Sequence, residues 1–297
     1  MFLYDTKFGR ENKVKKLFNY KGFNKLNQQE EIKLMEEFMR LVVSDLDGTL
    51  LNQKSEISDE TREVVRKLIE NGVDFAIATG RSISSVRAFK ERIGHDIYLI
   101  CNNGANIYNK DEEVIFERIM ESDIVEKLIK YFREKNVTYN GFYKKDLFTD
   151  EGTEEAVLTI EKGFNLVRLK EAEEFPVMTK MIVKDDPEVI VKLRDDMKEI
   201  FSDIVDITIS QPRCLDIVHK ECSKGKGIKM ISQKLNIPLD EIMAFGDGEN
   251  DFDMMQAVGH PVVMENGLET LKAKIKNKAP KNTDNGVAEY LKKYFSI

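Results

Sequence analysis

Residues 41–51 read LVVSDLDGTLL, an apolar run that ends in two carboxylates, a glycine and a hydroxyl. An uninterrupted apolar run is typical of a parallel strand that is covered on both faces. In open α/β sheets the ligand crevice lies beyond the carboxyl ends of the strands. At such an end Asp45 and Asp47 repel each other unless a cation or a phosphate-handling role holds them there. This stretch therefore predicts an α/β fold and the place of its chemistry.

Residues 44–49, SDLDGT, resemble motif I of the haloacid dehalogenase-like hydrolases. The other three motifs of that superfamily have counterparts in the same order: residues 75–81 (FAIATGR) resemble motif II, 223–225 (SKG) motif III and 245–251 (FGDGEND) motif IV. Acidic pairs alone are common in loops, whereas four motifs in order, three of them after strand-like runs, are specific. The resemblance extends over residues 39–297.

Further segments resemble the Cof-type (IIB) branch of this superfamily. They are residues 100–108 (ICNNGANIY), 215–218 (LDIV) and 282–288 (NTDNGVA). The long gap between Thr79 and Lys224 leaves room for the cap domain that these enzymes insert between motifs II and III. The resemblance thus implies an α/β protein with a doubly wound, Rossmann-like parallel-sheet core and an inserted α/β cap.

The resemblance also implies where the domains begin and end. The core domain comprises residues 39–118 and 220–297, the cap domain comprises residues 119–219, and the hinges lie near these boundaries. No family motif maps onto residues 1–38, and residues 39–42 (MRLV) resemble the usual start of a Cof-type chain. We therefore hypothesise that residues 1–38 are a mis-called leader, with a genuine N-terminal extension as the alternative.

Alternating apolar runs and amphipathic segments predict the order of strands and helices along the chain. One helix should begin after Ser58, whose hydroxyl can cap it, and end before Asn71 and Gly72. The expected strands cover residues 75–79, 98–101, 137–148, 177–183, 204–218 (one or two strands), 242–246 and 261–264. The expected helices cover residues 58–70, 124–134, 154–162 and 187–200, and others begin at Lys224, after Asn250 and at Gly286.

Composition excludes several classes of function. The formal net charge of −7 argues against a nucleic-acid-binding surface. The three cysteines lack the spacing of a metal site, which indicates reduced thiols in a cytoplasmic protein. No apolar run approaches the ~20 residues that a membrane-spanning helix needs. We expect a partner that is a small phosphorylated metabolite, neither nucleic acid nor membrane, and a monomer or small homo-oligomer.

The resemblance assigns the central chemistry to the acidic residues of motifs I and IV. Asp45 is the nucleophile and forms an aspartyl-phosphate, which divides one difficult step into two easier ones. Asp47 protonates the leaving alcohol and then activates water as a base. A carboxylate attacks a phosphate dianion poorly without a cation, so Mg²⁺ is the expected cofactor. Its implied ligands are the carboxylates of Asp45 and Asp247 and the backbone carbonyl of Asp47.

The phosphoryl oxygens should meet donors from motifs I, II and III. By resemblance, the Thr79 hydroxyl and the Gly80 amide bind these oxygens, and Lys224 neutralises them as a point charge. Gly48 permits the tight turn that brings backbone N–H groups towards the phosphate. Thr79 and Lys224 are therefore expected to act in catalysis as well as in phosphate binding.

Several residues, in motifs II and IV and in the cap, keep more than one interpretation. Asn250 donates to the phosphate or orients a ligand. Asp251 anchors Lys224 or a metal-bound water, or is an ordinary helix N-terminal acid. Arg81 orients a loop or reaches the substrate. In the cap, Phe142, Tyr143 and Phe148 are either core residues or, for one of them, a residue that touches the substrate.

The sequence as a whole predicts a Mg²⁺-dependent phosphatase for small phosphomonoesters, such as sugar phosphates, nucleotides, flavin mononucleotide or pyridoxal phosphate. One alternative is a phosphomutase, which resembles such enzymes but carries cap arginines that grip a second phosphate. This cap has only Arg133, Arg168, Arg194 and Arg213 among many Lys and Glu residues, which ranks the mutase lower. Another is a ligand-binding regulator without turnover, although every catalytic position holds a competent residue.

Overall fold

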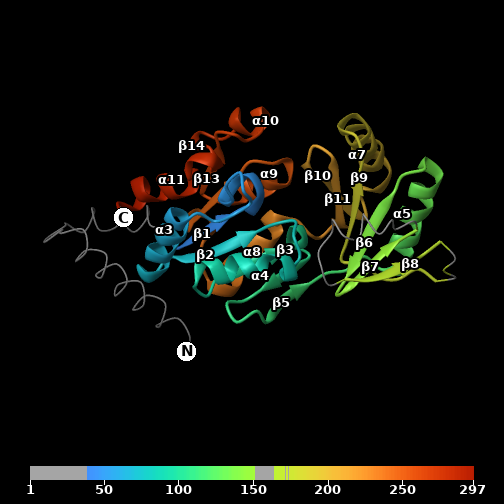
Figure 1. Ribbon diagram of the computed structural model, residues 1–297, viewed down its shortest axis with the longest axis horizontal. Helices are drawn as coiled ribbons and strands as arrows, with labels where there is room; N and C mark the ends of the chain where they lie inside the picture. The colour runs from blue at the N-terminus through green and yellow to red at the C-terminus, as the bar shows by residue number, and fades with distance from the viewer. Residues whose placement is uncertain (1–38, 151–163, 171, 173) are drawn as a thin grey trace, which may run out of the picture.

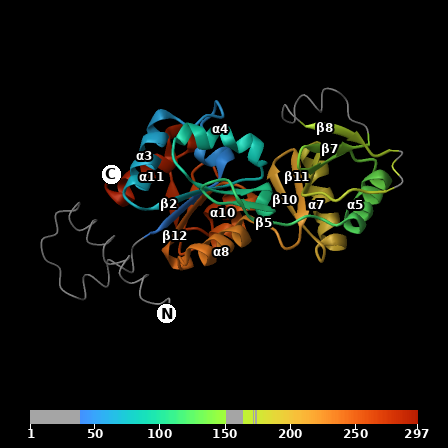
Figure 2. The ribbon, with the colours of Figure 1, turned by 90° about the horizontal axis from the view of Figure 1, so that it is seen from below.

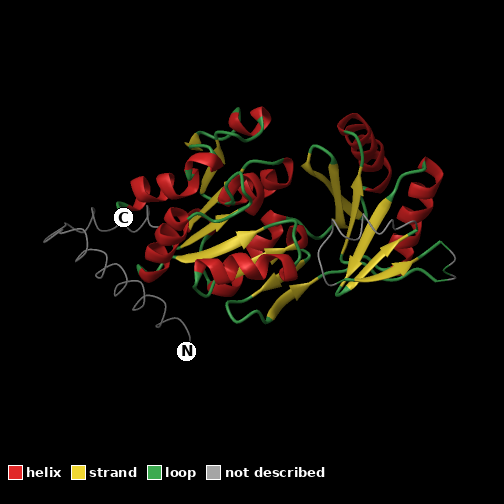
Figure 3. Ribbon diagram, viewed as in Figure 1, coloured by secondary structure: helices red, strands yellow, loops and turns green. Residues whose placement is uncertain are grey.

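Two β-sheets, each covered by helices, organise the chain (Figures 1 and 3). The computed structural model describes residues 39–150, 164–170, 172 and 174–297. The proposed leader at residues 1–38 and the helix expected at 154–162 lie outside the described residues. The strands of the larger sheet come from chain segments before and after those of the smaller sheet, as an inserted cap requires. The exact domain boundaries stay a prediction.

The larger sheet has the strand order β14-β13-β12-β1-β2-β3-β4-β5. Its first six strands in that order pair in parallel, and the doubly wound core expected from the sequence is confirmed there. Strands β4 and β5 pair antiparallel, because short turns join them and leave no room for a crossover helix. The strands are β1 Leu41–Ser44, β2 Asp74–Ala78, β3 Tyr98–Cys101, β4 Asn106–Tyr108, β5 Val114–Glu117, β12 Ile242–Gly246, β13 His260–Met264 and β14 Asn277–Ala279.

Alternation along strand β1 explains why helices cover both faces of this sheet. Val42 joins one buried cluster with α3, α4 and α11, while Leu41 and Val43 join another with α8 and α9. Figure 2 shows α3 and α4 on one side of the sheet and α8 on the other. The helices are α3 Asp59–Glu70, α4 Ile83–Ile93, α8 Lys224–Leu235, α9 Phe252–Ala257, α10 Glu269–Lys272 and α11 Gly286–Phe295.

The second sheet has the strand order β10-β11-β9-β6-β7-β8 and is antiparallel except between β7 and β8. Two helices share one buried cluster with it, α5 Ser122–Lys135 and α7 Pro187–Phe201. The segments expected at 137–148 and 204–218 each fold back as a hairpin. The strands are β6 Tyr139–Tyr143, β7 Asp146–Thr149, β8 Asn165–Arg168, β9 Lys180–Lys184, β10 Val205–Gln211 and β11 Cys214–His219. We call this sheet with its two helices the cap.

Candidate active site

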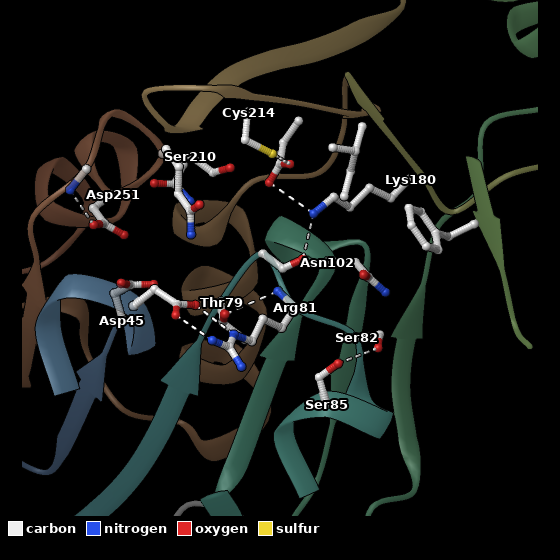
Figure 4. A pocket seen from close by; sticks show the side chains of 18 of the residues that line it. Asp45, Thr79, Arg81, Ser82, Ser85, Asn102, Lys180, Ser210, Cys214 and Asp251 are labelled. Atoms are coloured by element: carbon white, nitrogen blue, oxygen red, sulfur yellow. Dashed lines mark hydrogen bonds and ion pairs between the residues drawn. The ribbon is translucent and has the colours of Figure 1, made fainter. Parts of the chain in front are cut away.

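The loops after three neighbouring parallel strands meet beneath the cap (Figure 4). Asp45 follows β1, Thr79 follows β2 and Asp247 follows β12. Lys224 is the first residue of α8, and the Ser223 hydroxyl caps that helix by accepting from the Lys226 amide at 3.2 Å. Carboxyl ends of parallel strands share one edge of a sheet, which is why segments about 200 residues apart come together here.

A cavity of about 600 Å³ lies between these loops and the cap. Asp45, Asp47 and Thr79 line it from the core. Predicted site residues Gly80, Asn250 and Asp247 also line it, as do the cap residues Phe142, Lys180, Ile182, Ser210, Cys214 and Asp216. The volume falls within the range of about 300–1,000 Å³ that is typical of small-molecule sites.

Three carboxylates form an acidic cluster at the bottom of the cavity. Asp45, Asp247 and Asp251 offer oxygen atoms that all lie within 4.8 Å of one another, close enough to hold one metal ion. Burial, opposed in part by the charge of Lys224, raises the pKa of Asp45 well above its ordinary value. Burial and the nearby charge of Asp251 raise the pKa of Asp247 to about 7. Clustered carboxylate oxygens are the ligands that a hard cation such as Mg²⁺ prefers, and its charge would favour their ionised form.

Lys224 lies inside this cluster with a fully buried side chain. Its Nζ donates to Asp45 Oδ1 at 2.5 Å and to Asp251 Oδ1 at 2.6 Å. Burial by itself lowers the pKa of Lys224, but the charges of Asp251 and Asp45 outweigh it and hold the pKa above its ordinary value. Of the interpretations open for Asp251, the structure therefore shows the contact with Lys224.

The second oxygen of Asp251 shapes the loop after β12. Its Oδ2 accepts from the amides of Asp247 and Gly248 at 2.8 and 2.9 Å. Gly48 packs against the Asp247 side chain, and its φ of +79° and this close packing exclude a side chain. A Cβ there would lie 2.3 Å from Asp247 Oδ2. Gly48 is thus required for the approach of motif I to motif IV, a reason that the sequence pattern alone did not supply.

The side chain of Asp47 points away from the acidic cluster towards Arg81. Arg81 donates to both carboxylate oxygens, from Nε at 2.8 Å and from Nη2 at 2.6 Å. Its guanidinium also lies over the ring of Phe89, 5.3 Å from the centroid. A bidentate grip of this kind fixes a carboxylate more firmly than a single bond does. Arg81, for which two roles were open, here holds the predicted acid–base residue.

The remaining predicted phosphate ligands lie around the loop after β2. Thr79 is buried, and its Oγ1 accepts from the Arg81 amide at 3.2 Å. The Gly80 carbonyl accepts from the cap residue Lys180 at 2.8 Å. Asn250 donates from Nδ2 to Asn103 Oδ1 at 3.2 Å, and Asn103 follows the neighbouring strand β3. The structure thus brings all the predicted site residues together, and their roles stay predictions.

Comparison with known proteins accounts for this arrangement. The family model of the haloacid dehalogenase-like hydrolases matches residues 42–291. The chain belongs to this family. A putative phosphatase of Buchnera aphidicola is 29% identical over 86% of this chain and 96% of its own length. An HMP-PP phosphatase of Serratia proteamaculans is 30% identical over 79% of this chain and 86% of its own length.

Solved structures agree with this family assignment. A crystallised protein of Thermotoga maritima matches at a TM-score of 0.70 and 29% identity, covering 86% of this hydrolase and 97% of that chain. A haloacid dehalogenase-like hydrolase of B. subtilis shares the fold at a TM-score of 0.77 and 24% identity, covering 86% and 99%. The predictions of the family, the fold and a phosphatase-class enzyme are confirmed at this level. Among the described helices of the hydrolase, none is long and apolar enough to cross a membrane.

Sequence reasoning missed the cap side of the site. Lys180 on β9 donates to the Gly80 carbonyl of the core, and Asp216 on β11 accepts from the core residue Asn103. A signal was present, because Asn103 and Asp216 fall within two of the three segments that resemble the Cof-type branch. Of the three cap aromatics for which two interpretations were open, Phe142 lines the cavity. Phe148 belongs to the buried cluster of the cap, and Tyr143 packs against that cluster.

Proposed function

We propose that this hydrolase releases phosphate from small phosphomonoesters through an aspartyl-phosphate on Asp45. The observation that carries the proposal is the position of Asp45, which lies buried at the end of β1 beside Lys224 and lines the cavity. A nucleophile there is close to Thr79 and Gly80, which we assign to the phosphoryl oxygens. Phosphoryl transfer depends mainly on such positioning and on charge neutralisation.

We assign the metal site to the carboxylates of Asp45 and Asp247 with the Asp47 carbonyl. Both oxygens of Asp251 already accept protein donors, Lys224 at one and two amides at the other, so Asp251 serves better as an anchor than as a ligand. The all-oxygen donor set, with carboxylate oxygens of Asp45 and Asp247 in one cluster, supports Mg²⁺. When bound, Mg²⁺ would neutralise the charge between the attacking carboxylate and the phosphoryl group.

The reaction then divides into two half-reactions. Asp45 forms a bond to phosphorus while the bond to the ester oxygen breaks, and that oxygen takes a proton from Asp47. Water then loses a proton to Asp47, attacks phosphorus and restores the Asp45 carboxylate with release of phosphate. The bidentate grip of Arg81 positions Asp47 for both proton transfers, and it opens at the oxygen that gives or takes the proton.

The size of the cavity and its cover by the cap favour a small metabolite over a protein substrate. Relatives named HMP-PP phosphatase are consistent with this class of substrate. Sugar phosphates, nucleotides, flavin mononucleotide and pyridoxal phosphate remain the candidates, in a cytoplasmic enzyme. A phosphomutase has less support, because none of the four cap arginines is among the described residues that line the cavity.

The test is phosphate release from a panel of such esters, with and without Mg²⁺. We expect Mg²⁺-dependent release that Asp45→Asn lowers by at least about a thousandfold, as loss of a nucleophile does. Asp203→Asn, which changes an exposed carboxylate, is the matched control and should keep full activity. Release that survives in Asp45→Asn would overturn the assignment of the nucleophile. No release from any ester would overturn the proposed phosphatase activity.

A further inference from the structure

A buried ion pair of the cap contacts the core at the loop after β2. We call this loop, which holds the predicted phosphate ligands Thr79 and Gly80, the phosphate loop. Lys180 and Asp216 lie on neighbouring strands, β9 and β11, and are 4% and 2% exposed. Lys180 Nζ donates to Asp216 Oδ2 at 3.0 Å and to the Gly80 carbonyl at 2.8 Å. Figure 4 shows Lys180 between these two bonds, reaching down from the cap. The ammonium therefore joins the cap to the loop that carries Thr79.

The bond to Gly80 has a consequence for the Thr79 hydroxyl. The Gly80 carbonyl and the Arg81 N–H belong to one planar peptide group, in which they point in opposite directions. Lys180 holds the carbonyl, and the Arg81 N–H on the other side donates to Thr79 Oγ1 at 3.2 Å. A hydroxyl that accepts this bond keeps its own hydrogen to donate. Lys180 and Thr79 Oγ1 thus bond to opposite sides of one peptide group.

Asp216 extends the same contact to the loop after β12. Its Oδ2 also accepts from Asn103 Nδ2 at 2.8 Å, and Asn103 Oδ1 accepts from Asn250 at 3.2 Å. A Cβ on Gly80 would lie 2.9 Å from Asp216 Oδ2, so the carboxylate packs directly against the phosphate loop. The pair therefore contacts the loop of Gly80 directly and reaches Asn250 through Asn103.

We propose that Lys180, held by Asp216, is a positioning residue that orients the Thr79 hydroxyl for the phosphoryl group. The proposal rests on the phosphatase function proposed above. Lys180 acts through the Gly80–Arg81 peptide and only while the cap lies against the core. Closure of the cap and completion of the phosphate site are then one event, as in other enzymes whose lids finish the site.

The alternative is that the pair only stabilises the cap. Buried ion pairs are weak evidence for stability, because neutral groups of similar volume often replace them without loss. Replacing both partners together separates the two explanations. Lys180→Met with Asp216→Asn removes both charges, keeps nearly the same volumes and leaves an acceptor for Asn103. What it removes is the donor to the Gly80 carbonyl.

The experiment is a double-mutant cycle between this neutral pair and Thr79→Val. We expect the neutral pair to lower kcat/KM about tenfold in the wild-type background. In the Thr79→Val background, which has no hydroxyl to orient, the same pair should cost less than about twofold. Arg133→Met with Asp150→Asn is the matched control, because it removes a cap ion pair at 2.7 Å that does not reach the core, and it should change neither background.

Binding of inorganic phosphate is measured by calorimetry on the same four proteins with Mg²⁺. It should follow the same cycle, and it separates the two proposals because it needs no turnover. A wild type that binds phosphate with the expected coupling but hydrolyses no ester would overturn the function alone. Equal losses in both backgrounds, or no loss in either, would overturn the positioning role.

A second neutral pair, Lys180→Gln with Asp216→Asn, keeps the test valid if the first pair does not fold. Its shorter, uncharged donor should cost about threefold, and this loss should also disappear with Thr79→Val. Folding is checked by circular dichroism and thermal unfolding. If both neutral pairs fail to fold, the pair is a scaffold of the cap and the positioning role is wrong.

Discussion

Asp247→Asn should make the metal-free protein more stable at alkaline pH, although it removes a proposed metal ligand. Burial and the charge of Asp251 raise the pKa of Asp247 from its ordinary 3.8 to about 7. Between these two values the folded protein binds more protons than the unfolded chain does. The free energy of unfolding therefore falls as the pH rises from about 4, and it levels off above about 7. An amide has no charge to bury and escapes this loss.

The magnitude follows from the same two pKa values. Their separation corresponds to at most about 4 kcal/mol, because each pH unit is worth about 1.36 kcal/mol. Solvent reaches part of this half-buried carboxyl, and screening reduces the gain to about 1–3 kcal/mol. The asparagine keeps an Oδ1 that can accept from Thr49, which donates to Asp247 at 2.7 Å. Little of the gain should therefore be lost to a broken hydrogen bond.

Thermal unfolding in a chelator at pH 5 and pH 8 measures the effect. At pH 8 the Tm of Asp247→Asn should exceed that of the wild type by about 2–10 °C, and the difference should shrink at pH 5. Mg²⁺ should raise the Tm of the wild type at pH 8 and leave the variant almost unchanged. Asp203→Asn, the exposed control, should behave as the wild type. A variant less stable than the wild type at pH 8, or an equal difference at both pH values, would refute the reasoning.

Three other substitutions test separate contacts. Lys224→Met should lower the free energy of unfolding, measured in urea, by about 3–5 kcal/mol, because it leaves the buried carboxylates of Asp45 and Asp251 uncompensated. Added Mg²⁺ should restore part of the lost stability, and a loss below about 1 kcal/mol would contradict the prediction. Arg81→Lys should lower kcat about tenfold, since an ammonium cannot grip Asp47 at both oxygens, and unchanged kinetics would show that the grip is dispensable. Glu249 forms ion pairs with Arg194 and Lys198 of the cap helix α7, and Glu249→Gln breaks them. The variant should raise KM about threefold at low ionic strength, and this increase should disappear in about 0.5 M NaCl. A change in KM that does not depend on salt would argue against an electrostatic contact.

The parts of the site that the sequence predicts are those set by strand ends. Asp45, Thr79 and Asp247 each follow a short apolar run, and such runs become neighbouring parallel strands whose ends share one edge. The position of each side chain then needs only the strand that precedes it. Lys224 is predictable for a similar reason, because Ser223 marks the start of its helix.

Contacts between distant side chains could not be predicted in this way. The pairing of Arg81 with Asp47 and of Lys180 with the Gly80 carbonyl joins residues on different loops or different sheets. Such contacts depend on loop conformation and on how the cap lies over the core, neither of which leaves a periodic pattern in the sequence. The antiparallel strands β4 and β5 could not be predicted for another reason. They have only three and four residues, which is too short to show the alternation of a strand.

The charges of the acidic cluster give a physical reason why the proposed phosphate site should need a cation. Asp45, Asp247 and Asp251 carry three negative charges when ionised, and Lys224 balances one of them. Burial first, and then the neighbouring negative charges, raise the pKa values of Asp45 and Asp247 and so oppose their ionisation. A divalent cation removes the excess, so that a phosphate dianion can then approach Asp45 without net repulsion from the cluster. The same excess makes the metal-free site unfavourable for folding, and for this reason stability and cation binding should change together with pH.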